Sequence, residues 1–331
     1  MKNRLITRYK NYFLLTGGKF FIKLPLRRSI RLHNFMAALV FCSFSFTSCE
    51  KNIDLKIDNY KPVLVVEAYI NNEIPEYTYV VLSRSLEYFS TDFQSTGVSN
   101  AAVTITEGEV KNNRYVWNTS SKVELAEANF AGVPPSFRKG VYFDPRLVSN
   151  PPNALIGKPG KSYLLEISEG GNQYSAITTM LNPVPIDRIT TGYSYVDESD
   201  SNKIKFRITN NYKDPDTVNN TQLYYYRYAE NRNNFGWGGI SRPRAVGSDE
   251  LTNGQSIHLT HVRGFVVGDM VNYYMASVTR DVYNFWESFN KARDNGGPFS
   301  TPVVLTTNIK GDNVTGCFSG LSLSSKTIII R

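Results

Sequence analysis

Short segments rich in β-branched and aromatic residues recur along most of the chain. Between residues 61 and 183 they are separated by Asn, Gly and Pro clusters, a pattern typical of strands joined by turns. The first four segments are 62–70, 78–83, 101–106 and 115–117. Residues 126–160 are instead rich in Pro, Gly and Asn, and we expect a long irregular excursion there.

The clearest hairpin signal joins segments 162–167 and 173–178. Tyr163, Leu165 and Ile167 fall at every second position of the first segment, and Glu-Gly-Gly-Asn follows at 169–172. Strict alternation gives a strand one buried face, and the glycines suit a tight turn. Because the strands are short and no helical periodicity intervenes, residues 61–183 are predicted to form an immunoglobulin-like β-sandwich.

Two prolines in the stretch 182–185 mark the predicted domain boundary, since proline cannot continue a central strand. Residues 184–331 are predicted to form a second β domain, a sandwich or a barrel-like fold. Its strand signals lie at 203–208, 222–229, 256–262 and 271–278. One amphipathic helix is expected within 281–295, where four apolar residues share a face that should cover the end of a sheet. These four are Val282, Phe285, Trp286 and Phe289. The predicted class is therefore all-β with one helix.

The N-terminal region has the organisation of a secretory signal. An apolar run at 36–48 follows a basic leader and ends in the lipobox-like Phe46-Thr47-Ser48-Cys49. We therefore predict that residues 1–48 are signal peptide and leader, that Cys49 carries a lipid, and that 49–60 form a tether. A transmembrane helix is disfavoured because about 20 apolar residues are needed to span a bilayer. A soluble secreted protein stays open, since Phe46 stands where lipoboxes usually carry Leu.

The net charge of +8 belongs to the leader. Nine of the 37 Lys and Arg residues and none of the 29 Asp and Glu residues precede Cys49, so the remaining chain has 28 basic and 29 acidic residues. A near-neutral chain lacks the basic footprint of a nucleic-acid-binding protein. No nucleic-acid partner is expected.

The usual catalytic and metal-binding patterns are missing from the sequence. There is no Gly-x-Ser-x-Gly elbow, and the segments 197–200 and 214–216 lack the ligand spacing of a calcium loop. His258 and His261 are three apart on a predicted strand, so they face opposite ways and cannot chelate one metal together. Cys317 is expected to be a small buried residue. We predict no catalytic residues, no metal and no cofactor, although a hydrolase with carboxylates from distant segments stays open.

Three further stretches carry specific expectations. The segment 157–162, Gly-Lys-Pro-Gly-Lys-Ser, looks like the end of a phosphate-binding loop, but it lacks the first glycine and precedes a strand, so we expect a turn. Phe235 and Trp237 lie in a glycine-rich loop suited to stacking on a sugar or docking on a partner. Trp237 in the core is the alternative. Thr217, in Asp-Thr-Val, matches a bacterial O-glycosylation sequon within a polar loop.

Several motifs together resemble one family. They are Ser-Cys-Glu-Lys-Asn-Ile-Asp at 48–54, Val-Leu-Val-Val-Glu at 63–67, Asn-Ala-Ala-Val-Thr-Ile at 100–105, Gly-Lys-Ser-Tyr-Leu-Leu-Glu-Ile at 160–167, Gly-Pro-Phe-Ser-Thr-Pro at 297–302 and Thr-Asn-Ile-Lys-Gly at 307–311. This set resembles the Bacteroidetes-type lipoproteins grouped as domain-of-unknown-function family 4249. Where its members commonly have Gly-Val-Phe or Gly-Ile-Phe near the end, this chain has Gly316-Cys317-Phe318.

The resemblance implies a lipoprotein of the outer membrane, often encoded beside a TonB-dependent receptor, and it brings no catalytic residues. We therefore expect a non-enzymatic accessory or binding partner of such a transporter, anchored through Cys49 and facing either the cell surface or the periplasm. The alternative is a surface carbohydrate-binding or adhesive module that uses Phe235 and Trp237.

Overall fold

The computed structural model describes residues 61–86, 96–128, 139–218, 220–229, 245–295 and 303–331. All of them belong to one compact unit, Asn59–Arg331. The predicted leader, Cys49 and the tether lie outside the described residues. Among the residues described, no helix is both long and apolar enough to cross a bilayer.

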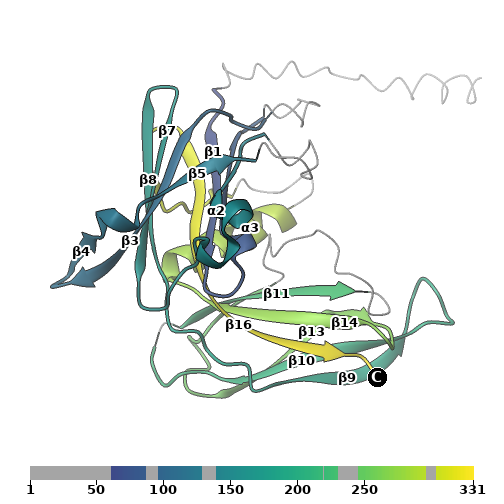
Figure 1. The fold of residues 1–331 in the computed structure, drawn as a ribbon. Coiled ribbons are helices and arrows are strands. Elements are labelled where there is room, and N and C mark those ends of the chain that lie inside the picture. Colours follow the sequence, from purple (N-terminus) through teal and green to yellow (C-terminus); the bar gives the residue numbers. More distant parts are fainter. Residues whose placement is uncertain (1–60, 87–95, 129–138, 219, 230–244, 296–302) are drawn as a thin grey trace, which may run out of the picture. The chain divides into compact units, whose positions relative to one another are not determined.

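The first β region is built from two sheets that share one core. One sheet contains β1 (Leu64–Asn71), β2 (Tyr79–Arg84), β6 (Val141–Phe143) and β5 (Val123–Glu127), and the other contains β3 (Ala102–Lys111), β4 (Arg114–Trp117), β7 (Ser162–Glu169), β8 (Asn172–Thr179) and β15 (Ile309–Lys310). The sheets are continuous through β5, which pairs with both β6 and β3. Their alternate residues pack together, with Val66, Leu82, Ile105 and Leu165 all buried. Figure 1 shows β1, β5, β7 and β8 rising together, with β4 projecting to one side.

The second β region also encloses a core between two sheets. One consists of β9 (Arg188–Val196), β10 (Ile204–Lys213) and β13 (Ser256–Phe265), and the other contains β11 (Thr221–Ala229), β12 (Ala245–Ser248) and β14 (Met270–Ser277). Ile208 and Phe265 from the first sheet pack with Tyr273 and Met275 from the second. Short strands with one apolar face are stable only when two such faces cover each other.

The longest strand, β16 (Val314–Ile329), belongs to both regions. Its first half pairs in parallel with β1, and its second half pairs antiparallel with β14. The predicted boundary at residues 183 and 184 stays a prediction, but the C-terminal strand completes the first region as well as the second (Figure 1).

Helix α3 (Arg280–Asp294) is the amphipathic helix expected from the sequence. Val282, Phe285 and Trp286 are buried and pack in one cluster with β1, β11 and β16 residues. Trp286 stacks on Tyr69 of β1, with ring centroids 6.3 Å apart. The expected aromatic stripe therefore covers sheet residues, and the all-β class with one such helix is confirmed.

Some elements differ from the sequence-based expectation. The excursion at 126–160 contains the short strand β6 and the one-turn helix α2 (Arg146–Ser149). The sequence also predicts no strand at the positions of β5, β9, β12, β15 and β16. Every residue of strand β9 is exposed or only partly buried, and most are polar. The strand therefore lacks the alternating apolar pattern on which strand prediction depends.

Candidate functional site

The β3–β4 hairpin is the most distinctive surface feature of the first region. Its two turn residues, Asn112 and Asn113, have φ angles of 51° and 61°, as a two-residue type I′ turn requires. Strand β3 pairs with β7 only as far as Gly108. Beyond that point, β4 is its partner among the described residues, so the hairpin tip extends past the sheet (Figure 1).

The hairpin has two chemically different faces, because side chains alternate along a strand. Glu107, Glu109 and Lys111 lie on one face of β3, and Gly108 and Val110 lie on the other. The register places Tyr115 opposite Val110 and Trp117 opposite Gly108, so both aromatic rings share the face of Val110. We call these the charged face and the aromatic face.

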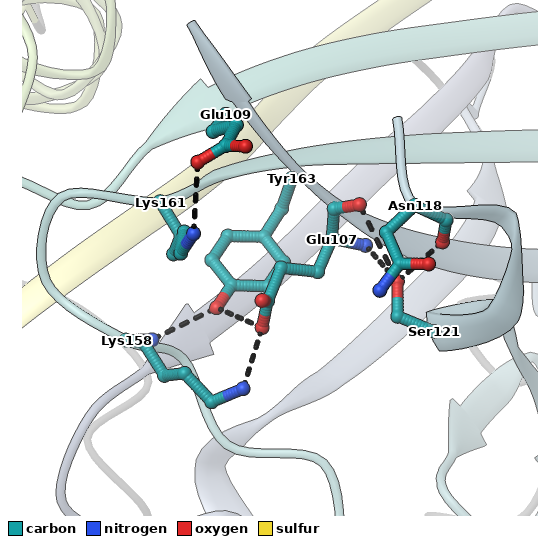
Figure 2. Close-up of polar contacts among 7 residues, drawn as sticks. All are labelled: Glu107, Glu109, Asn118, Ser121, Lys158, Lys161 and Tyr163. Atoms are coloured by element: carbon teal, nitrogen blue, oxygen red, sulfur yellow. Dashed lines mark hydrogen bonds and ion pairs between the residues drawn. The ribbon is translucent and has the colours of Figure 1, made fainter. Parts of the chain in front are cut away.

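The charged face is tied to the turn that precedes β7. Lys158 Nζ lies 2.9 Å from Glu107 Oε2, and Lys161 Nζ lies 3.2 Å from Glu109 Oε2 (Figure 2). Lys111 pairs with the other oxygen of Glu109. Hydrogen bonds from Lys111 and Lys161 lower the pKa of Glu109. Each carboxylate on this face therefore has at least one lysine partner.

Tyr163 joins this network from inside the protein. Its hydroxyl accepts a hydrogen bond from the Lys158 backbone N–H at 2.8 Å and donates one to Glu107 Oε2 at 3.3 Å (Figure 2). Burial, reinforced by the charge on Glu107, raises the pKa of Tyr163 well above its usual value. The phenol consequently stays protonated and acts as a fixed link between the turn and β3.

A one-turn 3-10 helix, Thr119–Ser121, follows β4 and contacts the base of the hairpin. The Ser121 hydroxyl accepts a hydrogen bond from the Glu107 backbone N–H at 3.0 Å and lies 2.7 Å from the Asn118 carbonyl oxygen (Figure 2). The Asn118 side chain caps this helix by accepting from Ser120 N. The hairpin base is thus held by the 3-10 helix as well as by the turn at 157–162.

These contacts explain why the segment 157–162 is not a phosphate-binding loop. Both of its lysines pair with carboxylates, and strand β7 follows it directly. The turn expected from the sequence is confirmed. The ion pairs of the charged face connect the hairpin to this turn.

The aromatic face is exposed. The rings of Tyr115 and Trp117 stack with centroids 5.3 Å apart and planes 10° apart. Trp117 lies directly over Gly108, where a Cβ would come within 2.4 Å of its Cε3 atom. Tyr115 is 47% exposed and Val110 is 53% exposed. The hairpin thus presents an aromatic pair and a valine at its surface, a composition typical of partner contacts.

Several residues singled out in the sequence lie elsewhere or outside the described residues. Phe235 and Trp237, like Cys49, are outside the described residues. Thr217 lies in an exposed turn, where its hydroxyl donates to Asn220 Oδ1 at 3.2 Å. Nothing brings Thr217 to the hairpin.

Cys317 and the two histidines lie where the sequence predicts. Cys317 is buried on β16, and burial raises the pKa of its thiol to about 12. His258 and His261 point to opposite faces of β13: His258 is exposed, whereas His261 is buried with Nε2 2.7 Å from the Tyr273 hydroxyl. Within the described part of the chain, no three His, Cys, Asp or Glu residues are grouped as a metal site would require.

The sequence predicts a strand at 115–117 but not its exposed aromatic pair. The sequence signal for this aromatic pair is the Asn-Asn turn at 112 and 113, followed by Tyr115 and Trp117 two residues apart. Alternation places such a pair on one face, but only the register shows that Gly108 leaves room for the Trp117 ring.

Fold and surface together define an all-β protein that displays a braced aromatic hairpin. A family model described as a domain of unknown function, DUF4249, matches residues 50–327. Because this match covers most of the 331 residues, the chain belongs to that family. No curated protein matches the sequence.

Proposed function

We propose that this protein is a lipid-anchored, non-enzymatic binding protein of the bacterial outer membrane and the accessory partner of a TonB-dependent transporter. The anchor is Cys49, at the end of the signal-like segment 36–48. The transporter is proposed from the family resemblance. The site that we assign to its contact is the aromatic face of the β3–β4 hairpin.

The observation that supports a partner contact is the exposure of Tyr115 beside Trp117 and Val110. Aromatic residues on a rigid element carry much of the energy of protein interfaces, because they bury a large area and lose little conformational freedom. The ion pairs of the charged face order the hairpin before binding. Such preorganisation reduces the entropic cost of association.

Strand β4 adds a second means of contact. It pairs with β3 alone among the described residues, so its outer edge is available to a strand of a partner. Backbone hydrogen bonds along an exposed edge give affinity, and neighbouring side chains give specificity.

Co-purification with the TonB-dependent receptors of the source bacterium tests the proposal. Tyr115→Ser in the full chain should reduce receptor recovery by about 10-fold or more, as expected for the loss of an interface anchor of about 2 kcal/mol. Val148→Ser is the matched control, because Val148 is 62% exposed on α2 and away from the hairpin. Equal recovery of the receptor with both variants would contradict the assignment of this face.

The glycan-binding alternative depends on Phe235 and Trp237. Both lie outside the described residues, so that alternative stays a prediction. A thermal melt of Trp237→Ala distinguishes an exposed Trp237 from one in the core. A small change in Tm is expected if Trp237 belongs to a contact loop. If it is a core residue, the free energy of unfolding should fall by about 3–5 kcal/mol, with a large drop in Tm.

A further inference from the structure

A second surface, on the three-stranded sheet of β9, β10 and β13, has the features of an anion site. The inner side of this sheet packs into the core through Ile208 and Phe265. Its outer side, which we call the outer face, bears Arg207 at the middle of β10. The register places Arg207 opposite Gly264 of β13, and Lys205 opposite Tyr195 of β9.

The guanidinium of Arg207 is held by two tyrosines of β9. Its carbon atom Cζ lies 5.4 Å from the ring centroid of Tyr193 and 5.2 Å from that of Tyr195. Nη1 donates a hydrogen bond to the Tyr193 hydroxyl at 2.8 Å. Cation–π contacts and one hydrogen bond therefore fix the position of the charge.

Arg207 lacks a counter-ion within the described part of the protein. No carboxylate there lies within ion-pair distance of it, and its buried Nε has no hydrogen-bond partner. The nearby Lys205 pairs with Asp197 at 2.5 Å, so that carboxylate is already engaged. A partly buried cation without an anion is costly, and an unsatisfied buried donor calls for an explanation. An anionic group bound to the guanidinium would supply the missing counter-ion.

The surface around Arg207 suits a sugar chain. Tyr193 is 63% exposed. The ring of Tyr195 reaches across the sheet to Gly264, where a Cβ would lie 2.3 Å from the Tyr195 hydroxyl. Any larger residue at position 264 would therefore displace this ring. Flat aromatic rings of this kind stack on the apolar faces of sugars.

Hydroxyl and amide groups continue along the same face. Thr209 and Thr260 form a side-chain pair at 2.8 Å, and His258 Nδ1 lies 2.6 Å from Asn211 Oδ1. Polar groups such as these match the hydroxyls of neighbouring sugar units. An acidic peptide would neutralise the charge of Arg207 but would form fewer hydrogen bonds with these hydroxyl and amide groups.

We infer that the outer face of β9, β10 and β13 binds an acidic polysaccharide, with the Arg207 guanidinium pairing with a uronic-acid carboxylate and Tyr193 stacking on a sugar ring. This inference is independent of the lipid anchor and of the β3–β4 hairpin. The carboxylate is held by charge-assisted hydrogen bonds, which are the strong kind.

Calorimetric titration of the full chain in detergent tests the inference with three probes: oligomers of galacturonate, alginate and hyaluronan. At least one should bind, and its carboxyl-reduced counterpart should bind about 10- to 100-fold more weakly, as expected for the loss of a charged hydrogen-bonded pair. Arg207→Gln should reduce affinity for the acidic oligomer by a similar factor. Arg114→Gln, which removes an exposed charge from the hairpin tip, should leave affinity within about 2-fold.

Two further measurements make the result decisive. Thermal melts check that the Arg207→Gln variant is folded. Tyr193→Ala should also weaken binding, because it removes both the stacking ring and one of the two rings that hold Arg207. Failure of all three oligomers to bind would overturn the inference, as would equal binding of reduced and acidic forms. Binding of oligoglutamate as tight as that of the best glycan would replace the sugar with an acidic peptide.

Discussion

The Tyr163 hydroxyl lies 3.3 Å from Glu107 Oε2, joining the buried core of the first region to the charged face of the hairpin. The same oxygen of Glu107 also receives Lys158 Nζ at 2.9 Å. One buried phenol thus links the core to the ion pairs that brace the proposed contact surface.

Tyr163→Phe should lower the free energy of unfolding by about 1–3 kcal/mol, because the Lys158 N–H loses its acceptor. Urea denaturation measures this change. Tyr115→Phe is the control: it removes an exposed hydroxyl and should change stability by less than about 0.5 kcal/mol. Equal effects of the two substitutions would show that the Tyr163 hydroxyl is not a structural link.

His261 makes stability depend on pH in one direction. Burial lowers the pKa of His261 to about 4, below the value of about 6.5 in an unfolded chain. The unfolded state therefore binds more protons between these values, and stability falls as pH decreases below about 6.5. Between pH 7.5 and pH 5, the wild type should lose about 2 kcal/mol more than His261→Gln.

His258→Gln serves as the matched control, since His258 is exposed on the other face of the same strand. Denaturant titrations at both pH values give the comparison. A pH dependence of His261→Gln identical to that of the wild type would rule out His261 as its source.

Cys317 should be unreactive while the protein is folded. Its thiol is buried and its pKa is raised to about 12, so almost none is thiolate at pH 8. Treatment with iodoacetamide followed by peptide mapping should find Cys317 unmodified in native protein and modified in urea. Rapid modification of the native protein would mean that β16 opens readily.

Membrane attachment is predicted to depend on Cys49. Cys49→Ala should remain unprocessed or become soluble, because lipidation of that thiol is the proposed anchor. Detergent partitioning of the wild type and the variant compares them. The same membrane retention in both would refute the anchor.

Strong local patterns carried most of the fold prediction. Alternation of Tyr163, Leu165 and Ile167 predicts β7 with its buried face, and the spacing of Val282 and Trp286 predicts α3. Both patterns are local, since each face is determined by residues within two turns or one strand.

The missing parts depend on contacts between distant segments. Parallel pairing of β1 with β16 joins residues 64–71 to 314–321, and no local pattern encodes that partner. Likewise, the sequence alone does not distinguish Arg207 from other polar strand residues. Only the strand register shows that Tyr195 and Gly264 lie beside it. The outer face is therefore a product of topology.

Site-specific photocrosslinking in cells tests the central proposal most directly. A benzophenone amino acid replaces Tyr115 in one strain and Val148 in another, each exposed in the unbound protein. The account predicts a covalent adduct with a TonB-dependent receptor from position 115 and none from position 148. No receptor adduct at position 115, or equal adducts at both positions, would contradict it.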